Sequence, residues 1–164
     1  MSDKAETEIK FQEIWCRLPY RWATGQYIGE WYREIKENGR IFANKCPSCG
    51  RFHCPPRAIC GRCHVKMEEK RKWVKVGPKG NVLSFGIVEQ SFWYPTTGEM
   101  LPVPFTVGII DLDGAPTTFT HYIAETNSEK LAIGMRVKAV FKPKRLRQGN
   151  IFDIVNFEVI DNHQ

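Results

Sequence analysis

Four cysteines stand in two closely spaced pairs, Cys46-Pro47-Ser48-Cys49 and Cys60-Gly61-Arg62-Cys63, with ten residues between the pairs. Each pair allows a tight turn that directs two sulfurs at one point, and two such turns complete the tetrahedron of thiolates that Zn²⁺ prefers. We therefore predict one zinc ion held by Cys46, Cys49, Cys60 and Cys63. Four protein ligands leave no position for water or substrate, so the metal is structural rather than catalytic.

Other interpretations of this cluster remain open. Iron in a rubredoxin-like site has the same geometry, and the cysteines could be simply buried or redox-active. His53, Cys54 and His64 lie close enough in the sequence to replace one of the four sulfurs. Gly50 and Gly61 are expected to relieve the backbone in the two turns.

The basic charge of the chain is concentrated around these cysteines. The formal net charge is +6, and residues 40–72 alone hold nine basic and two acidic residues, a net +7. Four thiolates with one Zn²⁺ contribute −2, so the segment stays basic after metal binding. Such a patch suits a polyanionic partner, which could be nucleic acid, a phosphorylated cofactor or an acidic protein surface.

The sequence shows no constellation for catalysis. It has no phosphate-binding P-loop, no GxGxxG and no GxSxG motif. His121 stands alone in an expected strand, and Asp111 and Asp113 are typical of a turn. The chain is therefore expected to be a binding or accessory module rather than an enzyme.

Composition limits where the protein acts. Hydrophobic residues make up 42% and charged residues 26%, as in ordinary globular proteins. No apolar run approaches the roughly 20 residues that span a bilayer, and residues 1–10 lack the layout of a signal peptide. We expect a cytoplasmic protein with no membrane partner.

The first of three predicted sections, residues 1–39, is an N-terminal arm followed by a helix over 24–38. The arm is rich in aromatic residues and could pack on its own domain or on a partner. In the helix, Trp31 and Tyr32 belong to an apolar stripe that either covers the core or anchors a partner. Thr24 is expected to cap the start and Gly39 the end.

The second section, residues 40–76, is the zinc ribbon, and the third, residues 77–164, is all-β. Alternating apolar residues predict strands over 83–87, 105–112, 117–124, 137–141 and 155–159. Five short strands with one apolar face are typical of a small closed barrel such as an OB-fold. Phe92 and Trp93 fall in an expected hairpin loop, where they could face a partner or acyl group, or plug the barrel.

Together the motifs resemble a known family. The helix is followed by Asn38-Gly39-Arg40, Cys46-x-x-Cys49-Gly50, Pro55-Pro56-Arg57 and Cys60-x-x-Cys63, and the barrel half carries Val107-Gly108-Ile109-Ile110-Asp111-Leu112-Asp113-Gly114. This order resembles the acyl-CoA-associated proteins, long labelled a domain of unknown function, that pair a rubredoxin-like zinc ribbon with a C-terminal OB-fold. The resemblance covers residue 24 to about residue 160. It implies a mainly β fold with an N-terminal helix, a rubredoxin-like ribbon and a five-stranded OB-fold barrel.

The resemblance also implies a function. Members of the family are non-catalytic partners of thiolase-superfamily enzymes, in hetero-oligomers where they aid assembly and contribute to the surroundings of coenzyme A. Within the family, residues 18–25 are most similar to the small subunits of benzoylsuccinyl-CoA thiolases of anaerobic toluene degradation. Coenzyme A carries a diphosphate and a 3′-phosphate, which Arg51, Arg57 and Arg62 could contact; alternatively, these arginines form a solvated face or touch a partner's acids.

Nucleic-acid binding is the competing function class. OB-folds bind single strands with basic grooves and aromatic platforms, and zinc ribbons occur in the same setting. However, residues 73–164 hold nine basic and nine acidic residues, whereas a single-strand groove should carry a basic excess. The sequence therefore favours an acyl-CoA enzyme subunit over a nucleic-acid-binding protein.

Overall fold

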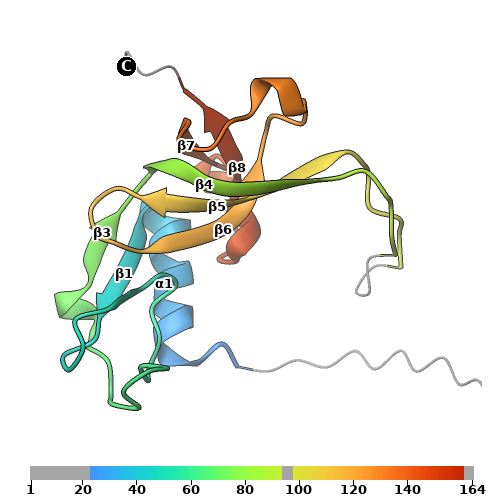
Figure 1. Cartoon of the computed structure of the whole chain (residues 1–164). Coiled ribbons are helices and arrows are strands. Elements are labelled where there is room, and N and C mark those ends of the chain that lie inside the picture. Colours follow the sequence, from blue (N-terminus) through green and yellow to red (C-terminus); the bar gives the residue numbers. More distant parts are fainter. Residues whose placement is uncertain (1–22, 94–97, 161–164) are drawn as a thin grey trace, which may run out of the picture.

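The computed structural model describes residues 23–93 and 98–160. Within these residues, a single α-helix precedes a small three-stranded sheet, which leads into a closed five-stranded barrel (Figure 1). The predicted fold class is thus confirmed: mainly β, one N-terminal helix, a cysteine-bearing ribbon and then an OB-type barrel. Within the described ranges, no helix has both the length and the apolar character needed to cross a membrane.

The ribbon is a sheet of three short antiparallel strands. Its central strand β1 (Ile41–Lys45) pairs with β2 (Phe52–His53) on one side and with β3 (Val74–Val76) on the other. Asn44 of β1 lies opposite His53 of β2. The short 3₁₀-helix η1 (Lys70–Lys72) precedes β3, and β3 runs on into the barrel, so the ribbon and barrel are covalently continuous at this point.

The barrel strands follow the order β4-β5-β6-β8-β7, and β7 closes on β4. The strands are β4 (Lys79–Val88), β5 (Phe105–Leu112), β6 (Thr118–Ile123), β7 (Arg136–Phe141) and β8 (Ile154–Val159). Among these five strands, the β6–β8 pairing is parallel and the other pairings are antiparallel. Three 3₁₀-helices, η2 (Ser128–Lys130), η3 (Lys144–Leu146) and η4 (Ile151–Asp153), lie between the later strands.

The helix α1 (Gly25–Asn38) shares one hydrophobic core with the ribbon and the barrel. Trp31 and Ile35 are fully buried and cluster with Ile41 of β1 and with barrel residues. The Trp31 ring lies 5.9 Å from that of Phe119 on β6, and its indole N–H donates to the Phe42 carbonyl at 3.1 Å. The prediction of Trp31 as a partner anchor is therefore wrong, because its ring is enclosed by the chain's own core.

The two predicted caps of α1 have different outcomes. Gly39 adopts the left-handed conformation with φ of 59°, and its N–H donates to the Ile35 carbonyl, as predicted. Thr24 stands at the N-cap, but its side chain forms no capping hydrogen bond, so that prediction is wrong. At the C-terminal end of the helix, near Gly39, the Arg147 guanidinium donates hydrogen bonds to the carbonyls of Ile35 and Lys36.

The strand alternation holds for β5 but not throughout. A β-bulge between Val82 and Ser84 leaves Leu83 45% exposed, although the alternation predicted over 83–87 places it on the apolar face. On β8, Phe157 is fully buried while Val155 and Val159 are 44% and 38% exposed. Ile154 instead takes the core position at the start of that strand. The register shift between β7 and β8 lies beside this residue.

Candidate metal centre and the adjoining groove

The two cysteine pairs form matching turns. In the first turn, the Cys46 N–H donates to the Arg51 carbonyl at 2.9 Å, and the Gly50 N–H donates to the Cys46 carbonyl at 3.0 Å. In the second turn, the Cys60 N–H donates to the Val65 carbonyl and the His64 N–H donates to the Cys60 carbonyl, both at 3.0 Å. The same hydrogen-bonding pattern thus positions each pair of sulfurs.

Each turn requires one residue with positive φ, at the position after its second cysteine. Gly50 fills it with φ of 70°, as predicted, but in the second turn the residue is His64, with φ of 55°. Gly61, predicted to relieve that turn, does not have positive φ. A non-glycine residue in this region is uncommon, which explains why the sequence pointed to the glycine instead.

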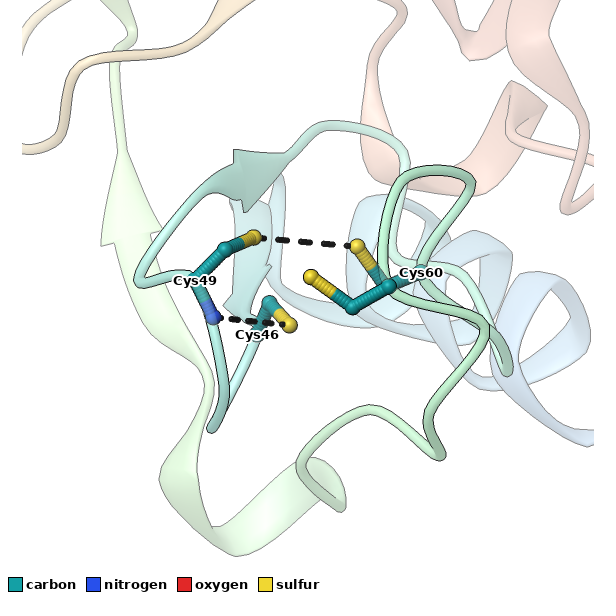
Figure 2. A group of neighbouring side chains, drawn as sticks. Cys46, Cys49 and Cys60 are labelled. Carbon is teal, nitrogen blue, oxygen red and sulfur yellow. Dashed lines mark hydrogen bonds between the residues drawn. The ribbon is translucent and has the colours of Figure 1, made fainter.

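The four predicted sulfurs converge, with Cys46, Cys49, Cys60 and Cys63 all lying within 4.8 Å of one another. Figure 2 shows Cys46, Cys49 and Cys60 with their side chains gathered in one place. The Cys49 and Cys60 sulfurs are 3.8 Å apart, which equals the edge of a sulfur tetrahedron with Zn–S bonds of ~2.3 Å. The cluster is therefore positioned for a metal ion, and its donors suit zinc.

The surroundings favour thiolates in this cluster. Backbone N–H groups of Cys63 and Arg62 hold the pKa of Cys60 down at about 5, with a smaller contribution from His53, whose Nε2 lies 3.9 Å from the Cys60 sulfur. The Cys49 N–H points at the Cys46 sulfur at 3.5 Å. By contrast, burial raises the pKa of Cys54 to about 12. Cys54 and the two histidines are not part of the cluster.

A groove of about 540 Å³ lies where the ribbon meets the barrel. The ribbon side of the groove contributes Arg51, His53, Cys54 and Arg57, and the barrel side contributes Leu83, Asp111, Thr117 and Thr118. Both arginines are exposed. The groove thus combines two guanidinium groups and two hydroxyl groups with the single carboxylate of Asp111, a set with a net positive charge that suits an anionic ligand such as a phosphate.

Arg62, the third predicted arginine, is exposed but does not line this groove. Arg62 lies between Cys60 and Cys63 in the second cysteine turn, whereas Arg51 and Arg57 both line the groove. The structure therefore brings together two of the three arginines that the sequence singled out.

A second hollow, of about 320 Å³, lies between α1 and η1. It contains Lys70, but this lysine forms ion pairs with both Glu30 and Glu34 of the helix. These acids raise the pKa of Lys70, with the Glu30 hydrogen bond as the largest cause. Because the lysine charge is already balanced within the chain, this hollow suits an anion less well than the groove.

Asn44 supports the groove and was not singled out from the sequence. Asn44 is fully buried, and its carboxamide forms two hydrogen bonds with the backbone of Arg57. Nδ2 donates to the Arg57 carbonyl at 2.8 Å, and Oδ1 accepts from the Arg57 N–H at 3.2 Å. Nδ2 also lies 3.4 Å from the Glu68 carbonyl. The only signal in the sequence was a polar residue directly after the apolar residues 41–43.

The remaining predicted contact residues, Tyr32, Phe92 and Trp93, do not line the groove. Tyr32 is half-buried on α1, with its ring 5.4 Å from that of Trp31. Phe92 and Trp93 are 48% and 67% exposed on the long connection between β4 and β5, which extends far beyond the barrel (Figure 1). They do not plug the barrel. The aromatic residues 15–22 of the N-terminal arm lie outside the described residues.

The fold and the cysteine cluster together define a protein that joins a zinc ribbon to an OB-fold. Residues 33–68 match the rubredoxin-like zinc ribbon domain of ChsH2, and residues 73–142 match the C-terminal OB-fold domain of ChsH2. The chain therefore belongs to the ChsH2 family, also known as DUF35, which confirms the resemblance seen in the sequence.

Solved structures agree on the fold. The chain is similar to one described as "Ltp2-ChsH2(DUF35) aldolase", with 18% identity, a TM-score of 0.54 and coverage of 85% of this chain and 97% of that one. It is also similar to a DUF35 protein of unknown function from Sulfolobus solfataricus, with 20% identity, a TM-score of 0.52 and 83% of each chain covered. No curated protein sequence matches.

Proposed function

We propose that this protein is a non-catalytic accessory subunit of a thiolase-type acyl-CoA enzyme complex, in which it aids assembly and helps to bind coenzyme A. The observation that carries the proposal is the groove between ribbon and barrel, with Arg51 and Arg57 on one wall and threonine hydroxyls on the other. Coenzyme A carries a diphosphate and a 3′-phosphate, and arginine is the side chain best suited to pair with phosphate oxygens.

The metal has a structural part in this proposal. Bound zinc supplies a cross-link between the two cysteine turns, which a ribbon with so little apolar surface needs. Cys46 and Cys60 are buried in a small cluster with Met67, separate from the main core. The ribbon residues then hold the groove in shape, while the reacting groups belong to a partner subunit.

The resemblance indicates which partner to test. We propose a catalytic subunit of thiolase fold in a cytoplasmic hetero-oligomer. The similar solved structure is described as an "Ltp2-ChsH2(DUF35) aldolase", and this supports the proposal that the chain works together with an enzyme subunit. The specific complex that we propose is benzoylsuccinyl-CoA thiolase, because residues 18–25 are most similar to the small subunits of these enzymes. Residues 18–22 of that stretch lie outside the described residues.

Purification of the tagged chain from its native host, followed by identification of bound proteins, tests the subunit assignment. A stoichiometric thiolase-fold subunit is the expected result. Turnover of an acyl-CoA substrate by the isolated, metal-loaded chain would contradict the non-catalytic role.

Calorimetric titration of coenzyme A into the purified complex tests the groove. Arg57→Ala should weaken coenzyme A binding about 10-fold, the value of one charge-assisted hydrogen bond. Arg62→Ala is the matched control, since Arg62 carries the same charge in the same ribbon outside the groove. Equal affinities for the two variants would remove Arg57 as a contact.

Single-stranded nucleic-acid binding is the second candidate. The exposed Phe92 and Trp93 on an OB-fold favour it, because aromatic side chains provide stacking platforms for bases. A fluorescent oligonucleotide whose affinity falls steeply with salt would establish this function instead. Weak binding, equal for Arg57→Ala and Arg62→Ala, would leave only general attraction to the basic ribbon.

A further inference from the structure

Exposed large apolar side chains gather on one part of the barrel. Among the described residues, six of them lie on β4, on β5 or on the connection between these strands: Leu83, Phe92, Trp93, Met100, Val103 and Ile109. Contiguous exposed apolar surface on a protein marks a site of interaction rather than ordinary surface.

Strand register shows that the apolar residues are continuous. On β5, Phe105, Val107 and Ile109 point outward, because the residues between them are buried. Val107 lies opposite Tyr122 on β6, and Ile109 lies opposite Ser84, next to Leu83 at the bulge. An apolar row therefore follows β5 along the outside of the barrel.

Ring contacts extend this row onto the connection. The Phe105 ring lies 5.7 Å from Tyr122 and 6.3 Å from Phe92, both edge-on. Trp93 then pairs with Met100 across the connection. We call this continuous surface, from Leu83 and Ile109 through Val107, Tyr122 and Phe105 to Phe92 and Trp93, the apolar strip. Figure 1 shows β4 and β5 running from the ribbon end of the barrel out to the projecting connection.

The strip carries little charge. Among the outward residues of β5 and β6, Asp111 is the only one with a charged side chain. It lies at the end of β5 that borders the groove. These strands and the first connection form the usual ligand face of an OB-fold. A nucleic-acid face needs basic residues there, whereas depletion of charge and enrichment of aromatic residues and Met are typical of a protein interface.

The strip also meets the groove. Leu83 belongs to both, and Asp111 lines the groove at the end of the outward row of β5. From Asp111 to Phe105 the strand spans about 20 Å. A ligand held by Arg51 and Arg57 can reach a reacting centre on another chain only if that chain borders the groove. The strip is the apolar surface that adjoins it.

We propose that the apolar strip is the docking surface for the catalytic subunit of the acyl-CoA enzyme, a protein partner that presents a matching apolar patch. The inference rests on the proposed function and adds the place where the partner binds. A second copy of this chain is a less suitable occupant, because it would bring another groove but no reacting centre. In the proposed complex, the partner covers β5 and β6 and packs against Phe92 and Trp93 of the β4–β5 connection.

The test compares two matched substitutions in the purified chain, Ile109→Glu in the strip and Ile133→Glu outside it. Both residues are exposed isoleucines, at 41% and 71%. Affinity for the purified catalytic subunit is measured by titration calorimetry. Ile109→Glu should weaken it at least about 30-fold, as expected for a charge placed at the centre of an interface, while Ile133→Glu leaves it unchanged. Trp93→Ala should weaken it as well.

Each outcome separates the two proposals. If the wild-type chain binds no acyl-CoA enzyme subunit, the proposed function fails. If it binds one and Ile109→Glu binds equally well with wild-type metal content and melting temperature, the strip is not the docking surface, although the function stands. If the wild-type chain forms a dimer that Ile109→Glu dissolves, the occupant is a second copy. Loss of oligonucleotide binding in Ile109→Glu alone would assign the strip to nucleic acid.

Discussion

Replacing Asn44 with alanine should both destabilise the protein and weaken its hold on an anionic ligand. The buried Asn44 carboxamide makes two hydrogen bonds to the Arg57 backbone, at 2.8 and 3.2 Å, and a longer one to the Glu68 carbonyl at 3.4 Å. Without them the segment around Arg57 loses its connection to β1. The guanidinium of Arg57 is then no longer held at the wall of the groove.

The magnitude follows from the number of bonds. Each lost hydrogen bond is worth about 1 kcal/mol net, so three give a loss of roughly 2–3 kcal/mol in the free energy of unfolding. The Arg57 side chain is exposed, so its freed backbone groups can turn to water, and the cost stays at the lower end for buried groups. For a chain of this length the loss corresponds to a fall of about 5–10 °C in melting temperature.

Thermal unfolding of the metal-loaded protein and coenzyme A titration of the complex measure the two effects. Asn156→Ala is the control, because the Asn156 carboxamide oxygen is buried without a hydrogen-bond partner. It should cost less than Asn44→Ala and leave ligand affinity unchanged. Equal melting temperatures for the two variants, or unchanged ligand affinity in Asn44→Ala, would refute the reasoning.

Three further predictions concern the metal, the pH dependence and the core. Cys49→Ser should abolish stoichiometric zinc, measured by elemental analysis; full metal content with wild-type stability would contradict the predicted ligand set. Burial lowers the pKa of His121, so the unfolded chain takes up its proton first, and stability should fall as the pH drops below the ordinary value of 6.5. In denaturant titrations across that range, His121→Phe should show a smaller fall than wild type. Trp31→Ala should cost about 3–5 kcal/mol and lower the single unfolding transition of helix and barrel together; a helix that melts separately would show that α1 is not part of the barrel core.

The metal centre was predictable because its chemistry is local. Two sulfurs separated by two residues can meet only in a tight turn, so Cys46, Cys49, Cys60 and Cys63 follow from spacing alone. The strand at 105–112 was also predictable, because it is a run of mostly apolar and β-branched residues that ends at Asp111-Leu112-Asp113-Gly114. Helix α1 and its Gly39 cap also depend on short-range signals. These features need no knowledge of what lies opposite.

The errors arose where the answer depends on distant parts of the chain. An amphipathic stripe shows that Trp31 faces something apolar, but not whether that surface belongs to the same molecule; here it is Phe119, 88 residues away. A β-bulge shifts Leu83 outward, and no residue type announces it. The hydrogen bonds between Asn44 and Arg57 could not be predicted for the same reason, since they join strand β1 to a loop that meets it only in the folded ribbon.

The division of the core explains why the metal matters to the groove. Ile41 and Ala43 of β1 are buried in the core shared with the barrel, and the first cysteine turn begins where that strand ends. The second turn rests on the separate cluster of Cys46, Cys60 and Met67, fixed further by the Tyr27 hydroxyl that donates to the Met67 carbonyl. The barrel can therefore place Arg51 without the metal. Arg57 lies between the two turns and depends on Asn44 and on the metal cross-link, so metal loss should affect the Arg57 side of the groove first.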